Sequence, residues 1–286
     1  MTEPEEHWDL EIKPTGSLFD LKLKDVWHYR DLLLLLVRRD FVSFYKQTVL
    51  GPIWFFVQPI ITILVYNLIF SNLAGIKTDN IPGPVFYLAG TIIWNYFAEC
   101  LTKTSTVFKD NSAMLGKVYF PRLIMPLSIV LSNLVRFAVQ FILFILLLGY
   151  YLIAGYPIAP NAYLLLFPLL IIIIAALGLG FGMIVSAVTT KYRDLSFVVS
   201  FGVPLLMYTT TVIYPLSEVV KKYSNYSWLI KYNPLTPVIE TFRYGFLGKG
   251  SFSWDLLLYS TIFTIVVLLA GIVVFNKVEK TFVDTV

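Results

Sequence analysis

Long apolar segments alternate with short polar ones along this chain of 286 residues. Six apolar segments approach the roughly 20 residues that a helix needs to cross a bilayer. They lie near Ile53–Leu73, Val85–Leu101, Leu123–Ile153, Ala162–Val188, Leu195–Tyr214 and Trp254–Phe275. The second is the weakest because Asn95 and Glu99 interrupt it, and the third is long enough for its first turns to lie outside the membrane. The pattern predicts an all-α integral membrane protein with six transmembrane helices.

An amphipathic segment precedes the first of these spans. Over residues 25–46, apolar side chains recur at helical spacing between basic ones. Such a helix lies along the membrane surface with its apolar face towards the lipids. We therefore expect an interface helix at 25–46, a polar cytoplasmic tail at 1–24 and a six-helix transmembrane domain at 47–286. A basic anchor for membrane lipids and a docking site for a partner are both compatible with this helix.

The last loop, between the fifth and sixth spans, contains two short apolar stretches. Tyr226–Ile230 and Val238–Leu247 flank Asn233 and Pro234, and each is too short to cross the membrane. They predict a pair of short re-entrant helices that dip into the outer leaflet before the last span. A surface loop that makes apolar contacts is the alternative.

Composition narrows the class of protein, and charge gives an orientation. Hydrophobic residues make up 57% of the chain, charged ones only 14%, and the mean hydropathy is +0.75. An ordinary soluble domain carries about 25% charged residues. Most of the 22 Lys and Arg residues fall in segments on the side of the N-terminus, which is typical of cytoplasmic loops. The sequence predicts a multi-pass membrane protein with both termini in the cytoplasm, and its basic character requires no nucleic-acid partner.

Residues suited to catalysis are sparse. The two histidines, His7 and His28, lie far apart before the first span, and Cys100 is the only cysteine, so we expect no catalytic set and no metal site. Gly248–Ser251 resembles the end of a phosphate-binding loop, but Arg243 stands where the upstream glycine is required. The chain is therefore expected to be no enzyme and to hold no cofactor, although a polytopic enzyme of glycan or lipid synthesis is an alternative class.

Two charges interrupt the predicted spans. Glu99 in the second and Arg136 in the third are costly in hydrocarbon, and they can face each other near the cytoplasmic side. A paired charge that fixes the register of the helices is favoured over direct contact with a substrate, and a proton relay is a further alternative. In the fourth span, Gly178 and Gly182 predict a face of close helix packing.

Aromatic and amide side chains form stripes on two predicted spans. A stripe at steps of four follows the first span, and a second stripe of aromatic rings follows the fifth. Rings pack on the apolar faces of sugars while amides meet hydroxyl groups, so the stripes indicate a lined passage for sugar; ordinary packing and an interfacial aromatic belt are the alternatives. The residues are Trp54, Gln58, Thr62, Tyr66 and Phe70 in the first span and Phe197, Phe201 and Tyr208 in the fifth.

A series of short motifs resembles one known family. The run from Arg38 to Pro59, with Tyr45-Lys46-Gln47-Thr48 and Gly51-Pro52-Ile53-Trp54 in it, is similar to the start of ABC-2 type permeases for polysaccharide and polyol-phosphate export. The resemblance continues over nearly the whole chain in Lys117-Val118-Tyr119-Phe120-Pro121-Arg122, Tyr192-Arg193-Asp194, Tyr214-Pro215 and Tyr232-Asn233-Pro234-Leu235. Each motif is weak alone, and their order makes the combination specific.

The resemblance implies a homodimer in the bacterial cytoplasmic (inner) membrane, paired with two ATP-binding subunits that would bind ATP and Mg²⁺. Such permeases export O-antigen, capsular polymer or teichoic acid, often on an undecaprenyl lipid. The first and fifth spans would line the channel, and Asn233 and Pro234 would belong to an outer gate. By position, the stroke of the ATPase would reach Arg38, Arg39, Tyr45, Lys117, Arg122, Tyr192, Arg193 and Asp194. The runner-up is an ABC-2 exporter of a small lipid or drug.

Overall fold

The computed structural model describes residues 23–46, 48–49, 51–115, 120–192 and 194–282. Every regular element among these residues is a helix. The helices are α1 (Leu23–His28), α2 (Arg30–Tyr45), α3 (Trp54–Tyr66), α4 (Gly83–Ser105), α5 (Val107–Asp110), α6 (Ser112–Leu115), α7 (Ile124–Ile153), α8 (Phe167–Lys191), α9 (Leu195–Leu206), α10 (Leu216–Lys222), α11 (Ser227–Lys231), α12 (Leu235–Leu247) and α13 (Trp254–Phe282), with 3₁₀ turns at Gly51–Ile53, Ala162–Leu166, Met207–Thr209 and Ser224–Tyr226 and a π-helix at Asn67–Leu73.

Four of the helical stretches are long and apolar enough to cross a membrane. They are Gly51–Leu73, Ile124–Ile153, Ala162–Lys191 and Trp254–Val278, and they correspond to the first, third, fourth and sixth predicted spans. The second predicted span forms α4, which is long but carries polar residues. The fifth forms the apolar helix Leu195–Thr209, which is shorter than a full span. The protein is therefore an all-helical, multi-pass membrane protein.

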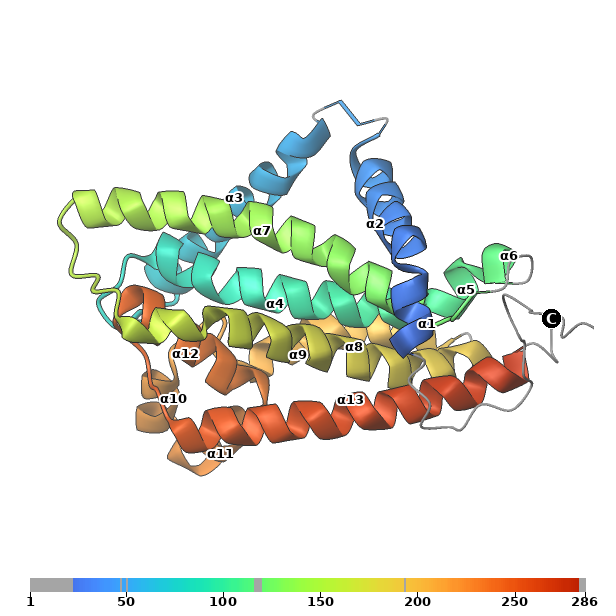
Figure 1. Cartoon of the computed structure of the whole chain (residues 1–286). Helices are drawn as coiled ribbons and strands as arrows, with labels where there is room; N and C mark the ends of the chain where they lie inside the picture. Colours follow the sequence, from blue (N-terminus) through green and yellow to red (C-terminus); the bar gives the residue numbers. More distant parts are fainter. Residues whose placement is uncertain (1–22, 47, 50, 116–119, 193, 283–286) are drawn as a thin grey trace, which may run out of the picture.

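The long helices run between two ends of the molecule. In Figure 1, α4, α7, α8 and α13 lie side by side along most of their lengths. One end, which we name the α12 end, gathers α10, α11, α12 and the first turn of α13. The other, the terminal end, gathers α1, α5, α6 and the last turns of α13. The chain therefore begins and finishes its described part at the same end of the bundle.

Helix α4 is the most enclosed of the long helices. Sixteen of its 23 residues, among them Phe86, Trp94 and Phe97, are buried, because α3, α7, α8, α9 and α12 all pack against it. Its two charged residues, Glu99 and Lys103, lie on the part of the helix that stays open, with side chains 47% and 40% exposed. They lower the hydropathy of α4 without placing a charge in its buried part.

Glycines bring α8 close to both of its main neighbours. A methyl group on Gly182 would lie 2.5 Å from Thr104 Cβ of α4, and one on Gly180 would lie 2.9 Å from the backbone of Leu268 in α13. Small residues allow helix backbones to approach this closely in membranes. The predicted packing face is confirmed, since Gly178 also faces α4, at Cys100.

The predicted interface helix divides in two. Its residues form α1 and α2, which meet at Tyr29 with φ −92° and ψ 21°. Helix α2 packs across α7 and buries Leu36 there, while Leu34 and Leu35 stay exposed. The predicted tail, residues 1–24, lies almost wholly outside the described residues.

Candidate functional site

The side chains of the predicted stripe on α3 are exposed at the start of the helix and packed at its end. Trp54 and Gln58 are exposed, and the Thr62 hydroxyl donates a hydrogen bond to the Gln58 carbonyl at 2.9 Å. Further on, Tyr66 and Phe70 turn towards α4, with ring centroids 6.2 and 6.3 Å from that of Tyr87. The stripe is thus open surface at its start and packed against the bundle at its end.

The stripe on α9 stays open throughout. Phe197 is 76% exposed, Phe201 71% and the neighbouring Tyr208 54%. One contact joins this region to α3, because the Tyr66 hydroxyl lies 3.7 Å from the Met207 sulfur. Exposed rings of this kind suit a passage, a second copy of the chain or the lipid.

Helices α3 and α9 are also the irregular ones. Pro59 lies inside α3 and Pro204 inside α9, where each removes a backbone hydrogen bond and favours a kink. Helix α3 then continues as the π-helix Asn67–Leu73, a form that occurs frequently at functional sites. The same two helices therefore have both exposed aromatic faces and an irregular backbone.

A charge cluster lies between α3, α4 and α7. The structure brings the two predicted intramembrane charges together, with Arg136 Nη1 3.4 Å from Glu99 Oε2. Lys103, one turn along α4, reaches the same oxygen at 3.1 Å. Beside them is a cavity of about 120 Å³ lined by Phe55, Gln58, Asn95, Tyr96, Glu99, Asn133, Arg136, Phe137 and Gln140. The role of Glu99 and Arg136 in transport stays a prediction.

A buried arginine at the α12 end was missed by the sequence analysis. Arg243 of α12 is 1% exposed, and its guanidinium lies 3.6 Å from the centroid of the Phe86 ring. It donates hydrogen bonds to the carbonyl of Thr211, to that of Val212 at 2.8 Å and to that of Phe86 at 3.3 Å. One side chain therefore ties α12 to α4 and to the segment that follows α9.

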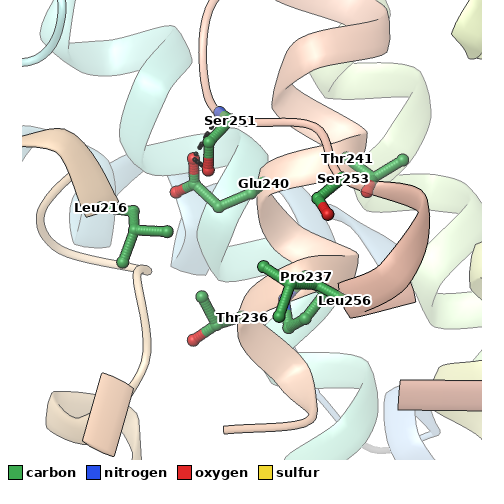
Figure 2. A pocket seen from close by; sticks show the side chains of 8 residues that line it. All are labelled: Leu216, Thr236, Pro237, Glu240, Thr241, Ser251, Ser253 and Leu256. Atoms are coloured by element: carbon green, nitrogen blue, oxygen red, sulfur yellow. Dashed lines mark hydrogen bonds between the residues drawn. The ribbon is translucent and has the colours of Figure 1, made fainter. Parts of the chain in front are cut away.

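Glu240 lies one turn before Arg243 and is equally buried. Its Oε1 is 3.7 Å from Arg243 Nη1, and its Oε2 accepts a hydrogen bond from the Ser251 amide at 3.0 Å. Burial raises the pKa of the Glu240 carboxyl, against the opposing effect of Arg243. Figure 2 shows the carboxylate directed at Ser251. A cavity of about 10 Å³ beside it, with Thr236 in its wall, has room for about one water molecule.

A sequence signal for this pair exists. Glu240 and Arg243 stand three residues apart inside the apolar stretch Val238–Leu247, so they share one face of a helix. Charges that interrupt a buried apolar face are paired or strongly hydrogen-bonded. In the sequence, Arg243 stood out only as the residue at the place of the missing glycine of a phosphate-binding loop.

The predicted gate residues join the α12 end to the 3₁₀ turn after α9 and to the long helix α13. The Asn233 amide donates hydrogen bonds to the Thr209 carbonyl at 3.1 Å and to its hydroxyl at 3.2 Å. Its Oδ1 accepts from the Leu235 amide at 3.0 Å at the start of α12. The Pro234 carbonyl accepts from the Ser260 hydroxyl of α13 at 2.6 Å. The predicted half-helices correspond to α11 and α12, both short.

Those predicted coupling residues that the structure describes lie on α2, before α7 and at the junction of α8 and α9. Arg38 and Arg39 are exposed on α2, where Arg39 pairs with Asp40 at 2.8 Å. Arg122 precedes α7, and Tyr192 and Asp194 flank the junction of α8 and α9, with Tyr192 exposed. Tyr45 ends α2, but its side chain, Lys117 and Arg193 lie outside the described residues. These roles stay predictions.

The fold and these surfaces define a multi-pass, all-helical membrane protein in which two proline-containing helices with exposed aromatic rings lie beside a bundle of longer helices. Its sequence matches the profile of the ABC-2 type transporter family over residues 31–247. The chain belongs to the ABC-2 type transporter family, and so is a membrane subunit of a transporter.

Relatives in this family match nearly end to end. The chain is 28% identical to the "O-antigen export system permease protein RfbA" of Myxococcus xanthus over 92% of its own length and 98% of the relative's. It is 28% identical to a protein of the same name from Klebsiella pneumoniae, over 89% of this chain and 94% of that one. It is 24% identical to the "Polysialic acid transport protein KpsM" of Escherichia coli, over 81% and 87% of the two lengths.

Proposed function

We propose that this chain is the permease of an ATP-driven exporter that moves lipid-linked polysaccharide, of O-antigen, capsule or teichoic acid type, across the bacterial inner membrane. The observation that carries the proposal is the family match together with relatives named for O-antigen export and polysialic acid transport over most of their lengths. The exposed rings of α9 and the open start of the α3 stripe support it, since both suit the faces of sugars.

The proposed topology has six spans and two cytoplasmic termini. Helix α4 is one of the two spans added to the four long apolar stretches. It runs the length of the bundle and packs against several neighbouring helices. Helix α9 with its 3₁₀ extension, Met207–Thr209, is the remaining span, which is short and contains Pro204. The terminal end is then cytoplasmic, α2 is the interface helix and α11 and α12 are the outer re-entrant helices. The division into a tail, an interface helix and a transmembrane domain belongs to the same proposal.

The proposed assembly is a homodimer with two separate ATP-binding subunits, which bind ATP and Mg²⁺. The match to the ABC-2 type transporter family implies the ATP-binding partner. Two copies facing each other through α3 and α9 would enclose their exposed rings. An ABC-2 exporter of a small lipid or drug is the second candidate, since the fold is the same.

Deletion and complementation test this function. The chain's gene is deleted in its host, and lipid-linked polymer is measured in the cytoplasm and at the cell surface. Polymer retained inside and lost from the surface, with recovery by the wild-type gene, is the expected result. Co-purification with an ATPase encoded beside it tests the assembly. Normal surface polymer in the deletion strain would refute polysaccharide export and favour the small-molecule alternative.

A further inference from the structure

A wide groove lies at the α12 end of the molecule. Its volume is about 1030 Å³, at the upper limit of the ~300–1,000 Å³ that is usual for sites of small molecules. Its walls come from residues 79–80 of the loop before α4, from α10, from the end of α11, from the segment 248–253 and from the first turns of α13. In the proposed topology the α12 end faces outward, so the groove opens on the outer side of the membrane.

Hydrogen bonds between these walls hold the groove in shape. The Ser217 hydroxyl of α10 donates to Asp79 Oδ1 at 2.8 Å, which joins the loop before α4 to α10. The Tyr259 hydroxyl of α13 donates to the Tyr232 carbonyl at 3.0 Å, which joins α13 to the end of α11. Figure 2 shows the segment after α12 fastened at Ser251. A preformed site of this kind loses less conformational entropy when a ligand binds.

The lining of the groove provides hydrogen-bond donors and acceptors together. Three lysines and three acidic residues line it beside serine and tyrosine hydroxyls, namely Lys221, Lys231, Lys249, Asp79, Glu240 and Asp255. An ammonium group only donates and an ionised carboxylate only accepts, whereas a hydroxyl group does both. A strongly charged ligand is matched by a surplus of the opposite charge, and this set is balanced. A ligand rich in hydroxyl groups uses both kinds of partner.

The apolar part of the lining includes two aromatic rings. Its aliphatic members are Leu216, Val220 and Leu256, fewer than the polar lining residues, which disfavours a lipid tail as the occupant. The rings of Tyr232 and Tyr259 lie with their centroids 6.1 Å apart and their planes at 88°. A tyrosine presents an apolar body and a polar tip, which suits the apolar face and the hydroxyl rim of a sugar. The groove therefore has the chemistry of a carbohydrate site.

We propose that this groove binds a segment of the exported glycan as it leaves the protein on the outer side of the membrane. The carboxylates of Asp79 and Asp255 accept hydrogen bonds from sugar hydroxyls, and the lysines donate to them. The inference rests on the proposed function and topology. The groove shares no lining residue with the aromatic stripes of α3 and α9, so it is a separate contact for the same cargo.

Photo-crosslinking in the living host tests the proposal with the native polymer. Benzoylphenylalanine is introduced at Val220, which lines the groove and is 47% exposed, and at Tyr226, which lies outside it and is 71% exposed. After irradiation the chain is purified and stained for glycan. A ladder of glycan-bearing bands should form from Val220 and be absent or much weaker from Tyr226. Lys221, which also lines the groove, carries the test if the Val220 variant does not accumulate.

Two acidic residues in matched positions separate recognition from structural damage. Asp255 and Glu218 stand in the first turns of α13 and α10, and of the two Asp255 alone lines the groove. With the cross-linker at Val220, Asp255→Ala should reduce the ladder at least about tenfold, the scale of a hydrogen bond to a charged group. Glu218→Ala should leave the ladder unchanged. The melting temperatures of the two variants should agree.

The outcomes of this experiment separate the groove from the function. Equal ladders from Val220 and Tyr226, equal losses in the two acidic variants, or a cross-link to a second copy of the chain would overturn the proposal. These results are read in a host whose surface polymer is lost on deletion of the chain, so they leave the export function standing. Normal surface polymer after deletion would instead refute the proposed function, and the glycan groove with it.

Discussion

Two groups of helices in this protein follow different rules. Helices α4, α7, α8 and α13 are long and pack through glycines and buried rings, such as Gly182 against Thr104 and Phe144 against Phe242. Helices α3 and α9 are short, contain Pro59 and Pro204 and leave many large apolar side chains exposed. The first group resembles a fixed scaffold. The second group has exposed apolar side chains and internal prolines, which suit helices that move or that are covered by a partner. The contrast teaches that tight packing and exposed apolar surface are assigned to different helices.

The largest expected effect is at the buried arginine that fastens the α12 end to the scaffold. Arg243→Met removes three hydrogen bonds to carbonyls and leaves the buried Glu240 without its cation. Breaking a buried pair costs about 3–5 kcal/mol, so we expect a large fall in the melting temperature of the purified chain. The double variant with Glu240→Gln should recover part of the loss, and Lys249→Met, at an exposed position nearby, should behave as wild type.

Removing one large ring from each group tests the comparison directly. Phe144→Ala in the scaffold should cost about 3–5 kcal/mol of stability because that ring is fully buried. Phe201→Ala on α9 should leave the melting temperature nearly unchanged, since the ring is 71% exposed, while polymer export falls. Thermal unfolding and surface polymer are measured on the same variants. Equal destabilisation by the two changes would abolish the distinction between the groups.

A single methyl group provides a finer test of the same contrast. Gly182→Ala places Cβ 2.5 Å from Thr104 Cβ, and overpacking of this kind costs about 1–3 kcal/mol. Gly202→Ala on α9 meets nothing within 4 Å, so its melting temperature should not fall. Detergent-solubilised protein followed by size-exclusion chromatography after heating measures both. A loss at Gly202 as large as that at Gly182 would mean that α9 is packed more tightly than the structure indicates.

The smallest expected effect is at the contact that joins α3 to α9. Tyr66→Phe removes the hydroxyl that approaches the Met207 sulfur at 3.7 Å and keeps the ring against Tyr87. A neutral hydrogen bond contributes about 0.5–1.5 kcal/mol, and a sulfur acceptor lies at the weak end. We expect a change in melting temperature close to the error of the measurement, with Tyr66→Ala, which also removes the ring, clearly larger.

Sequence pattern predicted the scaffold better than it predicted the site. Apolar runs and glycine spacing are properties of neighbouring residues, so α7, α8, α13 and the Gly182 contact followed from them. The partners of Arg243 come from α4 and from the segment after α9, far away in the chain, and no local pattern indicates such a set. The pairing of Glu99 with Arg136 was foreseeable only because charges in spans are rare, and Lys103 as a third member was not foreseen.

The enclosure of α4 has a consequence for how the chain is made. In the proposed six-span topology, α4 enters the bilayer before α7 and α8 are made, so residues such as Cys100 and Thr104 precede the helices that later bury them. The insertion of α4 in the bilayer is therefore unstable until α7 and α8 have been synthesised. A nascent chain stopped after residue 115 should be poorly retained in the lipid, whereas one that continues through α8 should keep all of its preceding helices inserted.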